Sequence, residues 1–372
     1  AGLGATFTTL PDGSWHFRGT AGRPHPQAAT LDLGNSGTGL RLLTAAAALC
    51  DCKVEFDGDA SLRTRTMAPL LAALEQLGAR TAAAPGGKCP LQVTGRLHGG
   101  KVAIDAQCSQ FLTALLLAAP WIPGGIEIDV TKLAEEPYVE ITLEWLKRLQ
   151  VRCDAATNLR HFVIPDSGYR GFTATIPADF STAAFPLGAG ILAAGSQGVA
   201  IRNLDFGDAQ GDKAVFVMVE TLGAKLCRGA DGTVTVHRSP RLQSGRLDLN
   251  ATPDALPLLA ALAAANDGMT LELANVPEAR LKETDRIACM TAELRKMGAD
   301  VTELSDGMIV RGRRLRGAEL QSYDDHRIVM ALAVAALAAE GGSTIRAAEA
   351  CAVTYPDFVK DFQALGAAFR LE

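Results

Sequence analysis

Residues 297–311 read Met-Gly-Ala-Asp-Val-Thr-Glu-Leu-Ser-Asp-Gly-Met-Ile-Val-Arg. A glycine directly after an amphipathic helical pattern is typical of the left-handed residue that ends a helix, so Gly298 predicts a helix end. Two β-like runs then flank Asp306-Gly307, a dipeptide that favours a tight turn between antiparallel strands. The stretch therefore predicts a helix followed by a hairpin with strands at 300–304 and 308–311.

The same signal recurs along the chain and defines a repeat. Its central residues are Gly4, Gly78, Gln150, Gly223, Gly298 and Gly366, spaced 68 to 75 residues apart. This period is longer than those of the common solenoid repeats, which predicts small α/β modules. Each module is expected to run strand, helix, strand, helix and hairpin, and the first module contributes only its hairpin, with strands at 6–10 and 14–18.

Length and composition exclude several classes of protein. The 372 residues correspond to about two domains of about 150 residues each. With 48% hydrophobic and 21% charged residues the chain is not wholly disordered. The net charge of −5 argues against nucleic acid or an anionic membrane as the main partner. The longest apolar runs, 255–265 and 328–339, are shorter than the roughly 20 residues that span a bilayer.

Cysteines and histidines indicate the compartment and the absence of a metal site. The eight cysteines are scattered and form no Cys-x-x-Cys pair. Together with the lack of a recognisable leader pattern, this predicts a reduced, cytoplasmic protein. The six histidines are dispersed, with no two at helix-face spacing, so no metal site is expected.

Each repeat also carries a polar cluster ahead of an apolar helix. The clusters lie at 34–38, 107–110, 179–182, 252–254 and 323–327, and helices are expected after them, for example at 40–49 and 328–339. Such residues are helix caps in the first place. Arg41 and Arg327, however, stand near helix starts, where a positive charge opposes the helix dipole. An anion bound at the helix N-terminus would explain them, and the helix starts of several repeats could converge on one anion site.

Residues 282–286, Lys-Glu-Thr-Asp-Arg, form the strongest chemical constellation. If they open a helix, Lys282 and Arg286 lie on one face, and the intervening acids could pair with them in a solvated surface helix. The alternative interpretation includes Arg327 at the start of the next helix. Two arginines and a lysine from separate segments suit a small polyanion, and a carboxylate among them could transfer a proton.

A set of motifs spread over the chain carries a family resemblance. They include Leu-Gly-Asn-Ser-Gly-Thr-Gly-Leu-Arg at 33–41, Cys-Ser-Gln at 108–110, Pro-Tyr at 137–138, Pro-Asp-Ala at 253–255, Arg-Leu-Lys-Glu-Thr-Asp-Arg at 280–286, Asp-Asp-His-Arg at 324–327 and Tyr-Pro-Asp-Phe at 355–358. In this order the chain resembles the 5-enolpyruvylshikimate-3-phosphate (EPSP) synthase family over essentially its whole length. The resemblance implies a two-domain α/β (α+β) fold of βαβαββ units. Residues 1–177 would hold the incomplete first unit and two more, and residues 178–372 three units.

The resemblance also implies an activity. Members of the family are 3-phosphoshikimate 1-carboxyvinyltransferases of aromatic amino acid biosynthesis, which move the enolpyruvyl group of phosphoenolpyruvate to the 5-hydroxyl of shikimate 3-phosphate and release phosphate. Phosphate leaves after the hydroxyl adds to C2 while C3 is protonated. These two small molecules would be the partners, no metal or organic cofactor is implied, and a monomer is expected.

The family motifs can be matched to this sequence residue by residue. Asp254 would be the base beside the 5-hydroxyl, Glu283 would handle the C3 proton, and Lys282 would lie between the substrates. The residues implied in phosphoenolpyruvate binding are Gly37, Arg65, Gln110, Arg286 and Arg327, and those implied in shikimate 3-phosphate binding are Cys108, Ser109, Gln110, Tyr138, Asp254 and Lys282. The residues from the second half are expected to face those from the first half across a cleft.

Four positions depart from the family pattern. Cys108 and Glu135 stand where the family has serines, Glu278 where it has an asparagine, and Val353 where it has a lysine. Glu135 would repel a phosphate if its side chain pointed inward. A βαβα stretch that family members carry ahead of this sequence, with a Lys-Ser pair and an arginine, has no counterpart in the 372 residues. Three explanations remain open: a fragment of a longer active protein, a diverged homologue with weak, altered or lost activity, or a non-catalytic homologue that only binds small anions.

Overall fold

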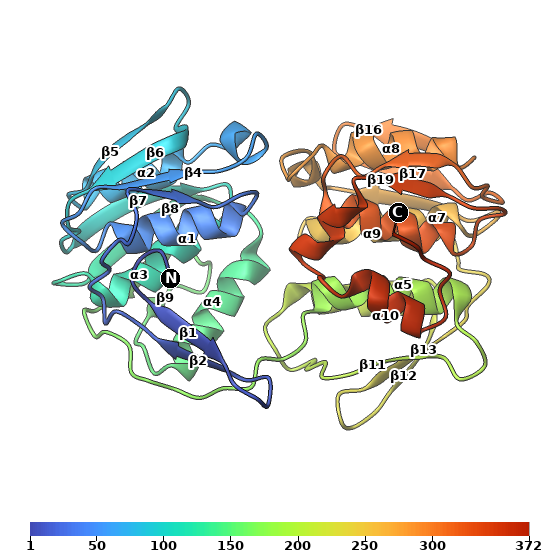
Figure 1. The fold of residues 1–372 in the computed structure, drawn as a ribbon, viewed down its shortest axis with the longest axis horizontal. Helices are drawn as coiled ribbons and strands as arrows, with labels where there is room; N and C mark the ends of the chain where they lie inside the picture. Colours follow the sequence, from blue (N-terminus) through green and yellow to red (C-terminus); the bar gives the residue numbers. More distant parts are fainter. Residues whose placement is uncertain (372) are drawn as a thin grey trace. The chain divides into compact units, whose positions relative to one another are not determined.

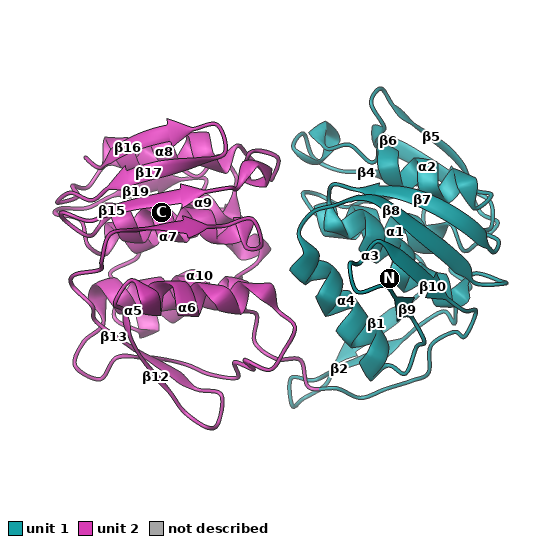
Figure 2. Cartoon of the chain, turned by 180° about the vertical axis from the view of Figure 1, so that it is seen from behind, with its two compact units in different colours: residues 1–174 teal, residues 175–372 magenta. Residues whose placement is uncertain are grey.

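The computed structural model describes residues 1–371, which form two compact units (Figure 2). Unit 1 covers residues 1–174 and unit 2 begins at residue 175. The stretch that joins them runs from the end of one strand at Ile164 to the start of a helix at Phe180, and the expected division after residue 177 lies within it. Each unit buries its own hydrophobic core.

Unit 1 is built from a hairpin and two repeats, coloured blue to green in Figure 1. Its elements in chain order are β1 (Thr6–Thr9), β2 (Trp15–Arg18), β3 (Thr30–Asp32), α1 (Gly37–Ala47), β4 (Val54–Asp57), η1 (Leu62–Thr64), α2 (Ala68–Gln76), β5 (Arg80–Ala84), β6 (Lys88–Thr94), β7 (Gly100–Ala106), α3 (Ser109–Ala118), η2 (Ala119–Trp121), β8 (Ile126–Leu133), α4 (Glu136–Arg148), β9 (Asp154–Ala155) and β10 (His161–Ile164). Here η marks a 3₁₀ helix.

Unit 2 contains the remaining repeats, coloured green to red in Figure 1. Its elements are α5 (Phe180–Ala193), β11 (Val199–Ile201), η3 (Gly211–Lys213), α6 (Ala214–Thr221), β12 (Lys225–Arg228), β13 (Val234–His237), β14 (Gly245–Asp248), η4 (Pro253–Ala255), α7 (Leu256–Ala264), β15 (Thr270–Ala274), η5 (Pro277–Arg280), α8 (Arg286–Lys296), β16 (Asp300–Leu304), β17 (Gly307–Arg311), β18 (Glu319–Gln321), α9 (His326–Ala336), β19 (Thr344–Arg346), η6 (Ala348–Val353) and α10 (Phe358–Ala364).

Three repeats are complete and share one sheet topology. Their strand orders are β3-β4-β6-β5, β7-β8-β10-β9 and β14-β15-β17-β16. In each, the first two strands are parallel and the hairpin strands join antiparallel. The predicted module is therefore confirmed.

The other repeats are shorter than expected. The repeat of α5 has a three-stranded sheet, β11-β13-β12, and that of α9 pairs only β18 with β19. No hairpin follows α10 within the described residues. The hairpin β1–β2 pairs only with itself among the described strands, and its side chains Phe7, Trp15 and Phe17 are exposed.

The predicted helix ends are confirmed by the backbone. Gly78, Gly223, Gly298 and Gly366 adopt φ between +96° and +100° directly after α2, α6, α8 and α10. At these angles a Cβ would be strained, which explains the recurring glycine. Gln150 takes the corresponding place after α4 with φ +58°.

One predicted helix start is wrong. Residues 282–285 form a loop after η5, and α8 begins only at Arg286. The side chain of Asp285 caps this helix by accepting a hydrogen bond from the Ala288 amide at 3.0 Å. An aspartate is favoured at this capping position, which shifts the start of the helix beyond Lys282. Lys282 and Arg286 therefore do not share a helix face.

The apolar runs form the core of unit 2. All nine residues of α7 are buried, and α7 packs against α9, in which nine residues are buried. No helix among residues 1–371 combines the length and apolarity needed to cross a membrane.

Candidate active site

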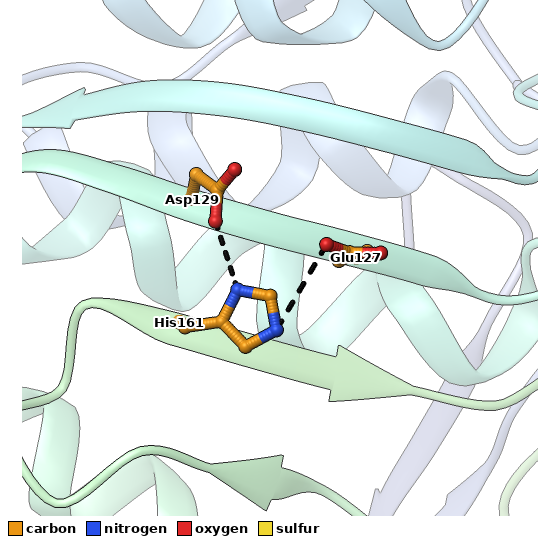
Figure 3. Close-up of side chains that lie close together, drawn as sticks. All are labelled: Glu127, Asp129 and His161. Atoms are coloured by element: carbon orange, nitrogen blue, oxygen red, sulfur yellow. Dashed lines mark hydrogen bonds and ion pairs between the residues drawn. The ribbon is translucent and has the colours of Figure 1, made fainter.

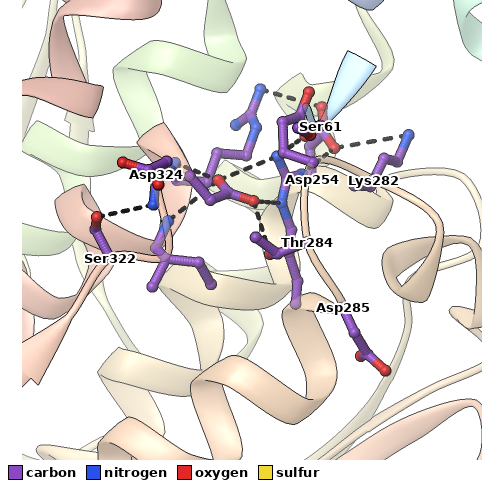
Figure 4. A network of polar contacts seen from close by, with 12 residues as sticks. Ser61, Asp254, Lys282, Thr284, Asp285, Ser322 and Asp324 are labelled. Carbon is purple, nitrogen blue, oxygen red and sulfur yellow. Dashed lines mark hydrogen bonds and ion pairs between the residues drawn. The ribbon is translucent and has the colours of Figure 1, made fainter. Parts of the chain in front are cut away.

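Six charged side chains of unit 2 form one ion-pair network, which we call the arginine–carboxylate cluster. Its members are Asp254, Lys282, Glu283, Arg286, Asp325 and Arg327. Asp254 and Lys282 are labelled in Figure 4, where a dashed line marks their ion pair. The six members come from η4, from the loop before α8, and from the starts of α8 and α9. Residues of the Lys-Glu-Thr-Asp-Arg motif and of the Asp-Asp-His-Arg motif thus lie together in space. The hypothesis of an anion site requires this arrangement.

Arg286 is the centre of this cluster, and its side chain is only 1% exposed. Its Nε lies 2.8 Å from Asp325 Oδ2, and its Nη1 lies 2.8 Å from Asp254 Oδ1. Its Nη2 donates to Glu283 Oε2 at 2.5 Å. A buried guanidinium is stable only when its charge and its donors are matched, and three carboxylates do this here. The surface-helix alternative for residues 282–286 is therefore wrong.

Asp325 ties the start of α9 to Arg286. It is the N-cap of α9 and accepts from the backbone amide of Arg327 at 2.8 Å. The hydroxyl of Thr284 donates to its other oxygen at 3.0 Å. The two residues before it, Tyr323 and Asp324, both have positive φ, and these left-handed residues make the tight turn that leads into the cap.

Asp254 shares its carboxylate among three cations. Besides Arg286, it lies 3.1 Å from Arg327 Nη2 and 3.8 Å from Lys282 Nζ. Arg327 Nε is buried and has no hydrogen-bond partner within the described residues. A buried donor of this kind costs free energy unless a ligand or water accepts from it. Arg327 therefore has a hydrogen-bond donor left for a ligand, whereas Nε, Nη1 and Nη2 of Arg286 all contact carboxylates.

The charges of the cluster shift the pKa values of its members. Burial alone would raise the pKa of Asp254, but Arg327, Lys282 and Arg286 together hold that pKa well below its usual range. Burial would lower the pKa of Arg286, yet Asp325, Asp254 and Glu283 raise it. Asp254 and Arg286 are consequently ionised at neutral pH, and Arg286 likewise lowers the pKa of the buried Asp325.

Unit 1 brings Gly37, Arg65 and Arg41 together. Gly37 is the first residue of α1, and a Cβ built on it would meet Nη1 of Arg41 and would lie 2.8 Å from Nη1 of Arg65. Arg65 Nη2 donates to the Asn35 side chain at 3.0 Å and to Ser61 Oγ at 3.2 Å. Ser36 caps this helix by accepting a hydrogen bond from the Gly39 amide at 3.0 Å. The two guanidinium groups add positive charge beside the capped end of the helix, where only a residue without a Cβ fits.

The Cys-Ser-Gln motif lies at the start of α3. Gln110 donates to Thr38 Oγ1 at 2.7 Å, which places it beside the residue that follows Gly37. Cys108 is the N-cap residue but makes no capping hydrogen bond with its side chain. Ser109 is buried, and its hydroxyl donates to Glu135 Oε2 at 2.9 Å. The Glu135 side chain therefore points inward.

Comparison with known proteins agrees with this arrangement. The profile described as EPSP synthase (3-phosphoshikimate 1-carboxyvinyltransferase) matches residues 2–362. The chain belongs to the EPSP synthase family. A 3-phosphoshikimate 1-carboxyvinyltransferase of Acetivibrio thermocellus is 42% identical over 96% of this chain and 83% of its own length. One from Methanosarcina acetivorans is 40% identical over 94% of this chain and 82% of its own length.

Solved structures show the same fold. An EPSP synthase from Acinetobacter baumannii superposes with a TM-score of 0.79 at 26% identity, covering 98% of this chain and 85% of that one. The enolpyruvyl transferase NikO from Streptomyces tendae superposes with a TM-score of 0.72 at 21% identity, covering 99% and 85%. The expected α/β fold of enolpyruvyl transferases is thus confirmed.

The residues at which this EPSP synthase family member departs from the family pattern differ in location and burial. Val353 ends η6 and is exposed. Glu278 lies in η5, and its Oε2 is buried without a hydrogen-bond partner in the part of the chain that the structure describes. Tyr138 stands in the first turn of α4, where its amide donates to the Glu135 carbonyl at 3.1 Å.

Sequence reasoning missed the role of Asp325. Its motif was recognised, but the residue itself was not assigned to the site, although it is fully buried against Arg286. The signal that could have identified it is an acidic residue three positions before the apolar run that begins at Ile328, where an N-cap is expected.

Strand pairing also creates a polar cluster that the sequence does not indicate. Glu127 and Asp129 on β8 meet His161 on β10, with His161 Nδ1 2.8 Å from Asp129 Oδ1 (Figure 3). Lys101 Nζ lies 2.8 Å from Glu127 and 2.9 Å from Asp129, so it supplies the charge that both carboxylates need. We interpret this group as a surface ion-pair cluster of the sheet.

His326 makes the stability of this family member depend on pH. Burial, together with Arg327 and Arg286, lowers the pKa of His326 to about 4. In the unfolded chain the value is about 6.5, so between these values only the unfolded state binds the proton. Stability should therefore be complete above pH 6.5 and fall by about 3 kcal/mol as the pH drops to 4.

Urea unfolding of the parent protein and of His326→Asn at pH 7, 5.5 and 4.5 checks this expectation. The difference between the two proteins should shrink as the pH falls, whereas His16→Asn, at an exposed position, should follow the parent throughout. Parallel curves for the parent and His326→Asn would show that His326 is not buried in its neutral form.

Proposed function

We propose that this chain catalyses enolpyruvyl transfer from phosphoenolpyruvate to the 5-hydroxyl of shikimate 3-phosphate. The observation that carries the proposal is the arginine–carboxylate cluster, which joins the two motifs most specific to the family with Asp254 of the Pro-Asp-Ala motif. A new C–O bond forms at C2 while C3 gains a proton. The C–O bond to phosphate then breaks, C3 loses a proton, and inorganic phosphate leaves.

The cations are assigned to phosphoenolpyruvate. Arg327, with its unused buried donor, is assigned to an oxygen of this substrate. Arg65, Gln110 and Gly37 are assigned to the same ligand because they lie together at the positively charged start of α1 in unit 1. Preorganised cations of this kind stabilise the charge that develops on carboxylate and phosphate oxygens. Arg286 contributes in the same way, but its main contacts are the carboxylates that it holds in place.

The carboxylates are assigned to proton transfer. Asp254 is the proposed base for the 5-hydroxyl, and Glu283 exchanges the proton at C3. In the free protein, the cations around Asp254 weaken it as a base. An anionic substrate that binds Arg327 and Lys282 would neutralise part of this charge, raise the pKa of Asp254 and make it a better proton acceptor.

The acceptor is assigned to Cys108, Ser109, Gln110 and Tyr138 in unit 1, together with Asp254 and Lys282 in unit 2. We expect the protein to act as a monomer in the cytoplasm and to require no metal or organic cofactor. Its place is the shikimate pathway of aromatic amino acid biosynthesis.

Release of inorganic phosphate tests the activity. The parent protein mixed with both substrates should release phosphate in proportion to enzyme and time, with the enolpyruvyl ether as co-product by mass spectrometry. Phosphate without the ether would indicate hydrolysis of phosphoenolpyruvate. Binding of both substrates without either product would support the alternative, a homologue that only binds small anions.

Arg327→Ala should weaken phosphoenolpyruvate binding by about 1.5–3 kcal/mol, the scale of a hydrogen bond to a charged group. Arg327→Lys should recover only part, since an ammonium cannot form a two-pronged contact with a carboxylate or phosphate. Titration calorimetry measures both effects. Arg246→Ala, which removes an exposed arginine of unit 2, serves as the control. Equal affinity of Arg327→Ala and the parent would contradict the assignment.

A further inference from the structure

Glu135 places a buried carboxylate at the N-terminal end of α3. Its Oε2 accepts from the hydroxyl of Ser109 at 2.9 Å and from the Ser109 backbone amide at 3.4 Å. Ser109 is 2% exposed and Glu135 is 7% exposed. Glu135 belongs to another element, directly before α4, and reaches α3 across 26 residues of sequence.

The site that this carboxylate occupies is suited to an anion. Amides at a helix N-terminus and a serine hydroxyl are the donors that phosphates and carboxylates use. Cys108, the N-cap residue of α3, makes no capping hydrogen bond with its side chain, and the first turn of α3 holds no acidic residue. The positive end of the helix is therefore balanced from outside, by Glu135.

Glu135 stands in a left-handed turn directly before α4. Its φ of +56° and ψ of +44° lie in the left-handed region, which a glutamate adopts at a cost of about 1 kcal/mol or more. Ala347, which has no polar side chain, adopts the same conformation directly before η6, so the turn itself does not depend on a carboxylate. The turn directs the Glu135 side chain to α3, and the hydrogen bonds from Ser109 hold the carboxylate where a ligand anion would otherwise bind.

We propose that Glu135 is a specificity-determining residue that acts as an internal anion at the N-terminus of α3 and disfavours an acceptor carrying a phosphate there. This inference rests on the proposed function, which assigns Ser109 to the acceptor. A phosphate that approaches Ser109 must displace the Glu135 carboxylate or lie beside it, and two such anions repel strongly away from bulk water. The protein consequently binds shikimate 3-phosphate more weakly than the hydrogen-bond donors at the start of α3 would allow. Its preference for shikimate 3-phosphate over shikimate is therefore smaller than it would be without Glu135.

Two substitutions of Glu135 and one neighbouring control test this inference. Glu135→Ser removes the charge and adds a hydroxyl donor, whereas Glu135→Gln removes the charge and keeps the size and an acceptor for Ser109. Glu136→Gln removes an exposed charge one residue away. Affinities for shikimate 3-phosphate and for shikimate are measured by titration calorimetry on the full chain with phosphoenolpyruvate present.

Glu135→Ser should bind shikimate 3-phosphate about ten- to a hundredfold more tightly than the parent, the range of one hydrogen bond to a charged group. Glu135→Gln should shift in the same direction by a smaller factor, and Glu136→Gln should match the parent. The affinity for shikimate should stay the same in all four proteins, because shikimate has no phosphate to compete with Glu135.

Unchanged or weaker binding of shikimate 3-phosphate in both Glu135 variants would overturn the inference, and so would an equal gain for shikimate. The proposed function is judged separately, by phosphate release from the parent at saturating substrates. If the parent turns over and the Glu135 variants bind no more tightly, only the inference is wrong. Tighter binding in the variants without turnover in any protein would support the inference and contradict the proposed catalysis.

Discussion

Replacing Arg286 by alanine should destabilise the protein by about 3–5 kcal/mol, the cost of leaving a buried ion pair without one partner. Arg286 contacts Asp254, Glu283 and Asp325, and Asp325 is fully buried. Without the guanidinium these carboxylates repel one another, and the cap of α9 loses the cation that neutralises it. Urea unfolding at pH 7 measures the loss.

Arg246→Ala is the matched control for this experiment. Arg246 makes a single 3.0 Å ion pair with Glu272 on the surface, with 59% of its side chain exposed. Exposed pairs of this kind contribute about 0–1 kcal/mol, so the unfolding curve should hardly move. If Arg286→Ala were no less stable than Arg246→Ala, the description of Arg286 as the centre of the cluster would be wrong.

The role of Arg286 changes how binding experiments should be interpreted. Any loss of phosphoenolpyruvate affinity in Arg286→Ala would combine a lost contact with the rearrangement of Asp254 and Glu283. Arg327, with one buried donor unused and its Nη2 paired with Asp254, gives the cleaner measurement. Arg286→Lys would retain the charge but could serve fewer carboxylates at once, and should be intermediate in stability.

Glu283→Gln should lower turnover about 10²- to 10⁴-fold, the usual contribution of a positioned acid or base. The amide oxygen can still accept from Arg286 Nη2, where Glu283 Oε2 now lies at 2.5 Å, so the cluster keeps its geometry while losing a proton carrier. Phosphoenolpyruvate affinity should change little. Steady-state phosphate release and titration calorimetry on the same preparation separate the two effects.

Glu303→Gln provides the comparison for this second prediction. Glu303 is also paired with an arginine, Arg280, at 2.9 Å, but it is part of β16 and stands outside the cluster. Its substitution should leave turnover at the parent level. Full activity in Glu283→Gln would show that another group transfers the C3 proton. A loss of activity with a matching loss of phosphoenolpyruvate affinity would instead assign Glu283 to binding alone.

The repeat could be predicted because its signals are local. A glycine after a helical run, as at Gly298, and an Asp-Gly turn between alternating residues each act within a few residues of chain. Local competition also explains the error at 282–285. Asp285 can cap a helix as readily as it can sit in its first turn, and only the hydrogen bond to Ala288 shows which of the two occurs.

The residue types of the sequence alone determined the repeat, the family and the cations available to an anion. Which carboxylate meets which cation was decided only by the tertiary structure. Asp254, Arg286 and Asp325 are separated by 32 and 39 residues and meet because η4, α8 and α9 begin at neighbouring places in one core. Similarly, nothing in the sequence pattern around Glu135 shows that its carboxylate reaches Ser109, 26 residues away. Ion pairing and burial depend on distance in space, and the strength of a charge interaction follows from the packing of segments that no local pattern encodes.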